Sequence, residues 1–123
     1  GECVGYGATY SAQGNEWIAT LPIGYADGFV RANQGRSMIV DNEEVEIVGR
    51  VCMDQCMIKL NSYKPLGTRV EIISKQMPVT RIADELNTIP YEILCLLSDR
   101  IPRVIIENGK QKAIVNLRLH ETY

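Results

Sequence analysis

The chain has 123 residues, 46% of them apolar, and a formal net charge of −2 at pH 7. This length and apolar content suit one folded domain with one core and exclude a disordered chain. The low charge, without any basic run, argues against a binder of nucleic acid or of an anionic membrane. No apolar run approaches the roughly 20 residues that span a bilayer.

The cysteine and histidine content does not predict a metal site. The chain has four cysteines, Cys3, Cys52, Cys56 and Cys95. Their spacing is not that of zinc ligands, and the one histidine, His120, is expected to be a solvated residue near the C-terminal end. We predict reduced thiols, as in a cytoplasmic protein. The absence of an initiator methionine and of a signal peptide suggests an excised domain spanning residues 1–123.

Near its start the chain places a tyrosine between two glycines, in Val4-Gly5-Tyr6-Gly7-Ala8-Thr9-Tyr10. The glycines leave Tyr6 without bulky sequence neighbours and let another surface approach it. A phenol in this setting can donate a hydrogen bond or transfer a proton. The same pattern also fits a bulged strand whose tyrosine lies on a core.

The following elements are short strands separated by turns. We predict strands over residues 16–21, 36–40, 44–48, 50–60 and 68–74. Val45 and Ile47 alternate with charged residues and should face inward. Glycine and proline predict a loop over residues 22–28, and Asp41-Asn42-Glu43 predicts a turn.

After residue 75 the pattern becomes helical. Thr80 is a candidate N-cap for a helix through Leu86, and Pro90 can open a second short helix. The apolar face of the second helix would contain Ile89, Ile93, Leu94 and Leu97. Asn108-Gly109 predicts a hairpin between strands 103–107 and 110–117. The fold class is therefore mainly β: a small closed, Greek-key-like β-barrel with two short helices.

Three later stretches contain polar groups that invite a functional explanation. Tyr25 lies beside a glycine in the loop Ile23-Gly24-Tyr25-Ala26-Asp27-Gly28. Arg50 and Asp54 interrupt an apolar stretch, where charges must pair or face a cavity; one structural ion pair would also explain them. Charges crowd Ser98-Asp99-Arg100-Ile101-Pro102-Arg103 at a helix exit, for which capping by arginine is the structural alternative.

Three motifs resemble, in order and spacing, the C-terminal domain of bacterial alanine racemases. They are Gly5-Tyr6-Gly7-Ala8-Thr9-Tyr10, Pro22-Ile23-Gly24-Tyr25-Ala26-Asp27-Gly28 and Gly49-Arg50-Val51-Cys52-Met53-Asp54-Gln55. The resemblance covers nearly the whole chain. It implies a preceding (β/α)8 barrel that holds pyridoxal phosphate on a lysine, and a head-to-tail homodimer in which this domain completes the active site on the partner's barrel.

The same resemblance implies the function. The whole protein would interconvert L- and D-alanine, supplying D-alanine to cell-wall peptidoglycan, and the isolated domain would be inactive. Its partners would be the two barrels and a small amino-acid substrate, without nucleic acid or membrane contact by this domain.

The resemblance also assigns roles residue by residue. Tyr6 matches the catalytic base on the L-isomer face; its pKa, ordinarily near ~10, must be lowered to accept a proton at neutral pH, in this family by an arginine of the barrel. Tyr25 matches the inner-gate tyrosine near the substrate and the cofactor phosphate. Met53 matches the residue whose backbone helps hold the substrate carboxylate, with Cys52 beside it. The corridor through which substrate enters is matched by Arg31, Arg50, Leu97 and, as companion acid, Asp54.

Asp99 departs from the family pattern, which usually has a tyrosine just before the arginine found here as Arg100. A shorter polar residue resembles the membrane-anchored serine racemases of vancomycin-resistance operons, and a carboxylate can accept a hydrogen bond from a serine hydroxyl. In that case Asp99 would bind substrate and the full-length protein could be membrane-anchored. The alternative is an alanine racemase in which Asp99 only pairs with Arg100 or Arg103.

Two other classes are disfavoured. Decarboxylase relatives share the two-domain plan, but their β domain carries a different cysteine-centred motif, and Gly-Tyr-Gly-Ala-Thr-Tyr argues against them. A non-catalytic binding barrel of the OB type would show a basic groove with exposed aromatic residues. Here aromatic residues are only 7% of the chain and the net charge is −2.

Overall fold

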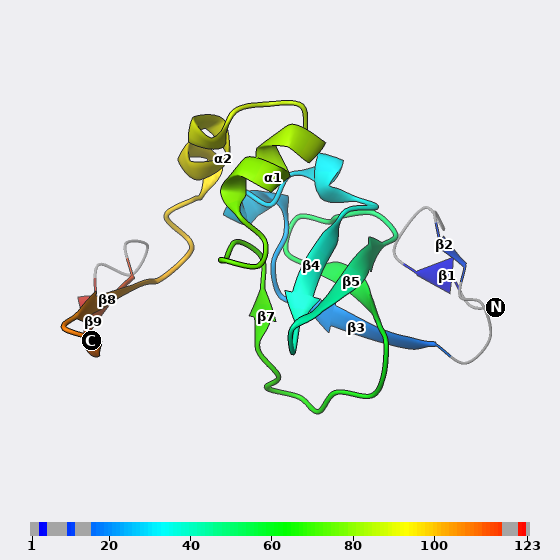
Figure 1. The fold of residues 1–123 in the computed structure, drawn as a ribbon, viewed down its shortest axis with the longest axis horizontal. Coiled ribbons are helices and arrows are strands. Elements are labelled where there is room, and N and C mark those ends of the chain that lie inside the picture. Colours follow the sequence, from blue (N-terminus) through cyan, green and yellow to red (C-terminus); the bar gives the residue numbers. More distant parts are fainter. Residues whose placement is uncertain (1–2, 5–9, 12–15, 117–120, 123) are drawn as a thin grey trace.

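The computed structural model describes residues 3–4, 10–11, 16–116 and 121–122. These residues form a central antiparallel sheet, two short helices and two smaller strand groups (Figure 1). The elements are β1 (Cys3–Val4), β2 (Tyr10–Ser11), β3 (Trp17–Leu21), η2 (Tyr25–Asp27), η3 (Arg31–Asn33), β4 (Ser37–Val40), β5 (Glu43–Val48), β6 (Cys56–Leu60), β7 (Val70–Glu71), α1 (Val79–Glu85), α2 (Pro90–Leu96), β8 (Arg103–Glu107), β9 (Lys110–Asn116) and β10 (Glu121–Thr122). None of the helices in these ranges is long and apolar enough to cross a membrane.

The five-stranded sheet has the order β3-β6-β5-β4-β7. β4, β5 and β6 follow one another as a meander, and β3 lies beside β6, which is the strand order of a Greek key. The sheet curls strongly (Figure 1). Its strands β4, β5 and β6 contribute buried side chains to one hydrophobic core. The predicted mainly β, Greek-key-like fold with two short helices is therefore confirmed. The sheet is a half-barrel where a closed barrel was expected, because its described edge strands, β3 and β7, do not pair with each other.

β4 is buried on both faces because it lies between two cores. Met38 and Val40 contribute to the main core inside the curled sheet, whereas Ile39 contributes to a second core beneath the helices. The main core also contains Phe29, Val45, Ile47, Val51, Cys56 and Ile58, and the second contains Met77, Ile82, Ala83 and Ile93. Successive side chains of a strand point to opposite faces, so burial on both sides explains the unbroken apolar run of β4.

Two predicted strands are shorter than expected. Residues 50–55, expected to begin a long strand, instead form a turn in which the Cys52 N–H donates to the Gln55 carbonyl over 2.9 Å. The ladder therefore starts only at Cys56. The strand predicted over residues 68–74 is reduced to Val70–Glu71. Val70 and Ile72 nevertheless both pack on the main core, as the alternation predicts.

The two helices agree only in part with the starts and the buried face that the sequence predicted. α1 begins at Val79 after Pro78, so the predicted N-cap at Thr80 is wrong and Thr80 lies inside the helix. α2 begins at Pro90, as predicted. Of its expected apolar face only Ile93 is buried; the other members are exposed, namely Ile89, Leu94 and Leu97.

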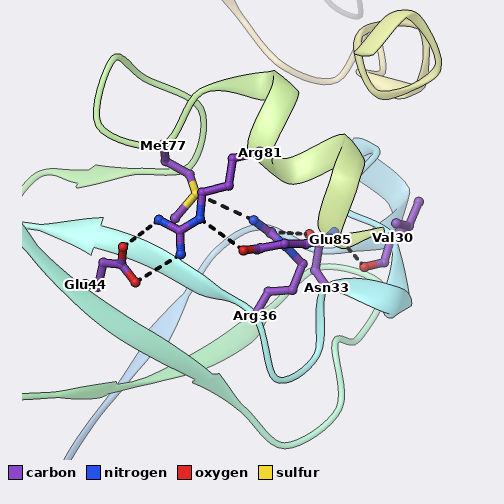
Figure 2. Close-up of polar contacts among 7 residues, drawn as sticks. All are labelled: Val30, Asn33, Arg36, Glu44, Met77, Arg81 and Glu85. Carbon is purple, nitrogen blue, oxygen red and sulfur yellow. Dashed lines mark hydrogen bonds and ion pairs between the residues drawn. The ribbon is translucent and has the colours of Figure 1, made fainter. Parts of the chain in front are cut away.

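A chain of alternating charges fastens α1 to the sheet (Figure 2). Arg81 pairs with Glu44 of β5 at 2.5 Å and with Glu85 at 3.0 Å. Glu85 also accepts a 2.9 Å hydrogen bond from Arg36, whose side chain is only 8% exposed and donates to the side-chain oxygen of Asn33 in η3. The hydrogen bonds from Arg81 are the main reason why the pKa values of Glu44 and Glu85 are lowered. The network thus connects β5, α1, η3 and the residue Arg36 that precedes β4.

The predicted hairpin at Asn108-Gly109 is confirmed. Both residues have positive φ, 53° and 74°, as a two-residue primed turn requires. β8 and β9 pair across it, with a register shift between Ile105 and Ile106. The hairpin extends away from the central sheet (Figure 1).

Candidate active site

The loop that carries Tyr25 is bonded through its backbone to the turn that carries Cys52 and Met53. The Tyr25 N–H donates to the Cys52 carbonyl and the Ala26 N–H donates to the Met53 carbonyl, each over 3.0 Å. The structure therefore brings together two of the motifs that the sequence singled out. Tyr25 itself is 43% exposed and Met53 is 52% exposed, so both side chains can reach a ligand or a second surface.

Gly24 allows this close approach. Its φ of −155° is extended backbone that any residue can adopt. A Cβ at this position, however, would lie 2.1 Å from the Cys52 carbonyl oxygen and 2.4 Å from that of Met53. Glycine is required here by the distance between two backbones, and that distance places Tyr25 beside Met53.

The same loop packs on its other side against the end of α2. The Ser98 N–H donates to the Asp27 carbonyl over 3.0 Å. At Gly28, where φ is +100°, an added Cβ would lie 2.1 Å from the Leu96 carbonyl oxygen. The loop is thus held between the Cys52–Asp54 turn and the segment that carries Asp99. We call residues 24–28, 52–54 and 96–100 the three-segment site.

Arg100 connects all three parts of this site. Its Nη2 donates to Asp54 over 2.6 Å, and its Nε lies 3.5 Å from the Asp27 carboxylate. The pKa of Arg100 is raised, first by the hydrogen bond to Asp54 and then by the charge of Asp27, opposed by partial desolvation. One cation, Arg100, therefore lies between the carboxylates of Asp27 and Asp54 and joins the three segments.

The predicted site residues fall into three groups. Those with exposed side chains in the three-segment site are Tyr25, Met53, Asp54, Leu97 and Asp99. Cys52 is half-buried in the turn, and Arg50, also half-buried, immediately precedes it. Arg31 is exposed at the start of η3. Tyr6 lies outside the described residues.

Two residues of the site have no predicted role, although both lie inside the quoted motifs. Asp27 is buried and accepts a hydrogen bond from the Gly24 N–H over 2.9 Å. Arg100 reaches across to it from the end of α2. For Asp27, the only sequence signal of such a role is that an acidic residue precedes Gly28 in a loop, a feature that many ordinary turns share.

The cysteines differ in environment. Burial in the main core, with Cys52 close by, raises the pKa of the Cys56 thiol from 9.0 to about 11. Cys95 is exposed on α2. Over the ranges that the structure describes, no three histidine, cysteine or acidic residues are grouped so as to hold a metal ion.

We expect Cys56 to resist alkylation in the folded protein. Iodoacetamide at pH 8 should label Cys56 only after unfolding in urea, whereas exposed Cys95 serves as the reference. Because the unfolded thiol ionises first, folding stability should fall as the pH rises from about 9 to about 11. Peptide mass spectrometry measures the labelling, and equal rates at Cys56 and Cys95 in the native protein would contradict the expectation.

Comparison with known proteins identifies the family. The family model described as alanine racemase, C-terminal domain, matches residues 1–105. The chain is 56% identical over 108 residues to the alanine racemase of Lactococcus lactis subsp. cremoris (strain SK11), a match that covers 85% of this chain and 29% of the relative. The alanine racemase of Streptococcus pyogenes serotype M5 (strain Manfredo) is 55% identical over the same length, with 85% and 30% covered.

Solved structures agree in fold. The alanine racemase from Bacillus anthracis with bound L-Ala-P superposes with a TM-score of 0.94 at 44% identity, covering 97% of this chain and 32% of that one. The alanine racemase from E. faecalis superposes at 0.81 with 48% identity, covering 84% and 29%. The chain thus spans about 30% of the length of these relatives. By sequence and by fold, it belongs to the alanine racemase family and corresponds to the C-terminal domain of its members.

Proposed function

We propose that this chain is part of a pyridoxal-phosphate-dependent racemase that interconverts L- and D-alanine and supplies D-alanine to peptidoglycan. The observation that carries the proposal is the bonding of the Tyr25 loop to the Cys52–Met53 turn, which sets two substrate-binding motifs of the family side by side. The similar Bacillus anthracis enzyme was solved with L-Ala-P bound, which is consistent with a small amino-acid ligand.

The residues of the site suit the binding of an amino acid and a phosphate. Tyr25 presents a phenol whose backbone is held on both sides, so its O–H can donate to a phosphate or carboxylate oxygen at a fixed place. The Met53 backbone would help hold the substrate carboxylate, with Cys52 beside it. Tyr6 would exchange the proton on the L-isomer face. The bound cofactor would supply the electron sink that makes this proton removable.

The lysine that binds the cofactor must come from another part of the protein. The chain contains Lys59, Lys64, Lys75, Lys110 and Lys112. None lies in the three-segment site, and three of them pair with acidic residues elsewhere. This chain therefore fits the role of completing a cofactor site, rather than of holding the cofactor covalently.

A second surface must cover the three-segment site. Tyr25, Met53 and Asp99 are exposed in this chain, whereas a racemase must exclude water around the reacting centre. We propose that the barrel of a second subunit provides this cover in a head-to-tail homodimer, near the substrate corridor of Arg31, Arg50, Leu97 and Asp54. This chain by itself should be inactive.

The test is the activity of the full-length protein. Purified with pyridoxal phosphate, it should convert L-alanine to D-alanine, measured with a D-amino-acid oxidase assay. Full occupancy by the cofactor without formation of D-alanine would overturn the proposal.

A second candidate, serine racemisation, is favoured by Asp99. This residue is exposed in the three-segment site, between two anchored neighbours, where a carboxylate could accept a hydrogen bond from a substrate hydroxyl. A hydrogen bond that serine can make and alanine cannot discriminates more strongly than an apolar wall does.

If Asp99 binds the serine hydroxyl, Asp99→Tyr should lower kcat/KM for serine at least about tenfold more than for alanine. A tenfold shift corresponds to about 1.4 kcal/mol of transition-state discrimination. Both substrates are measured in the full-length enzyme, with Asp84→Tyr, at an exposed position of α1, as the control. An unchanged serine-to-alanine ratio would leave an alanine racemase in which Asp99 does not select substrate.

A further inference from the structure

The Asp27 carboxylate occupies the middle of the three-segment site, yet the proposed function gives it no role. Its side chain is only 12% exposed. One oxygen accepts the Gly24 N–H over 2.9 Å, and the other lies 3.5 Å from Arg100 Nε. A buried carboxylate is costly unless it is both hydrogen-bonded and paired, so this position requires both neighbours.

The two contacts of Asp27 have different chemical demands. An amide oxygen could accept the Gly24 N–H as well as a carboxylate oxygen can. A negative charge, however, stabilises a guanidinium at 3.5 Å more strongly than a neutral amide does. The acid at this position is therefore explained by Arg100, which belongs to the segment of Asp99, and not by the local loop.

Arg100 connects the loop of Asp27 with the turn that contains Asp54 and with its own segment, residues 96–100. Its Nη2 reaches Asp54 next to Met53, and its own N–H donates to the Ser98 hydroxyl over 3.2 Å. The Ser98 N–H in turn donates to the Asp27 carbonyl. On the far side, Arg103 donates to the Ser98 carbonyl over 2.8 Å. Asp99 thus lies between two residues, Ser98 and Arg100, that are both tied to Asp27.

We propose that Asp27 is a positioning residue of the racemase: through Arg100 it holds Tyr25, Met53 and Asp99 as one unit against the amino-acid substrate. This inference rests on the proposed function. The Arg81–Glu44 pair provides the contrast, because its hydrogen bonds join α1 to β5 and do not involve the three-segment site. Removing the charge of Asp27 should therefore weaken substrate binding. Removing the charge of Glu44 should change only the stability of the folded protein.

The first test is a pair of variants in the full-length holoenzyme, Asp27→Asn and Glu44→Gln. Asp27→Asn keeps an acceptor for the Gly24 N–H but removes the charge that faces Arg100. Misplacing contacts by about 1 Å can cost up to 10²-fold. Because the held residues bind ground state and transition state alike, KM for alanine should rise about tenfold with little change in kcat. Glu44→Gln should leave KM unchanged.

The second test does not depend on activity. Hydrogen exchange followed by mass spectrometry reports on the amides of Ser98 and Ile101, both of which are hydrogen-bonded in this segment. Exchange there should be faster in Asp27→Asn and should match the wild type in Glu44→Gln. Arg100→Lys provides a second variant in case Asp27→Asn does not fold, because lysine does not reproduce the two separate groups, Nε and Nη2, with which Arg100 meets Asp27 and Asp54. The double variant, Asp27→Asn with Arg100→Lys, should raise KM and the exchange rates no further than the more affected single variant does.

The outcomes separate the two proposals. A wild-type protein that binds the cofactor but does not racemise alanine overturns the proposed function, and the exchange experiment then decides on Asp27 alone. A wild-type protein that racemises alanine, together with an unchanged KM in Asp27→Asn, overturns the positioning role. Unchanged exchange at Ser98 and Ile101 in both Asp27→Asn and Arg100→Lys overturns it as well.

Discussion

Replacing Tyr6 with phenylalanine in the full-length protein should slow racemisation of L-alanine by about 10²- to 10⁴-fold, the usual contribution of a positioned proton-transfer group. Phenylalanine keeps the ring but removes the hydroxyl that would exchange the proton. Cofactor binding should persist, because the proposed cofactor lysine lies outside this chain. Initial rates from both isomers and the absorbance of the bound cofactor measure the two effects.

Tyr63→Phe is the matched control for this experiment. Tyr63 is 62% exposed and its ring contacts Trp17 edge-on, with centroids 5.1 Å apart, so the variant keeps its packing. Its rates should equal those of the wild type. If Tyr6→Phe also racemises L-alanine at the wild-type rate, Tyr6 is not the base and another group must exchange the proton.

Gly24→Ala should destabilise the protein by about 3 kcal/mol, at the upper end of overpacking effects. The new methyl group would meet the carbonyl oxygens of Cys52 and Met53, which belong to backbone and cannot rotate away. The loop must then separate from the turn, so that the N–H groups of Tyr25 and Ala26 lose their acceptors. Urea unfolding of the full-length protein measures the loss of stability.

Gly67→Ala separates steric from conformational causes. Gly67 has a φ of +91° and no atom within 4 Å of an added Cβ, so alanine there meets only the backbone penalty of about 1 kcal/mol. Gly24 has the opposite combination, an ordinary φ and no space. Equal unfolding midpoints for the two variants would show that the loop and the turn can separate at little cost.

Much of the fold follows from local chemistry and could be predicted without coordinates. Alternation placed Val45 and Ile47 inward, and both are buried. Pro90 opens α2 because its fixed φ and missing N–H suit the first helical turn. Asn108-Gly109 makes the hairpin turn because both residues tolerate positive φ. Each of these signals depends only on neighbours in the sequence.

The motifs for the site were also readable in the sequence, since short runs of particular residues suffice to mark them. Their arrangement was not. Arg50 and Asp54 suggested an ion pair within one strand, whereas Asp54 pairs with Arg100, 46 positions away. Thr80 has the chemistry of an N-cap, but the helix begins one residue earlier, at Val79 after Pro78.

Gly24 and Asp27 show most clearly what depends on tertiary structure. Nothing in their sequence neighbourhood indicates that Gly24 must clear two carbonyl oxygens of a distant turn, or that Asp27 must face a guanidinium from the end of α2. Steric exclusion and charge pairing act over a few ångströms in space, whatever the separation along the chain. Sequence patterns therefore identified the family and most elements, and only the packed structure shows which backbone and which charge hold the site together.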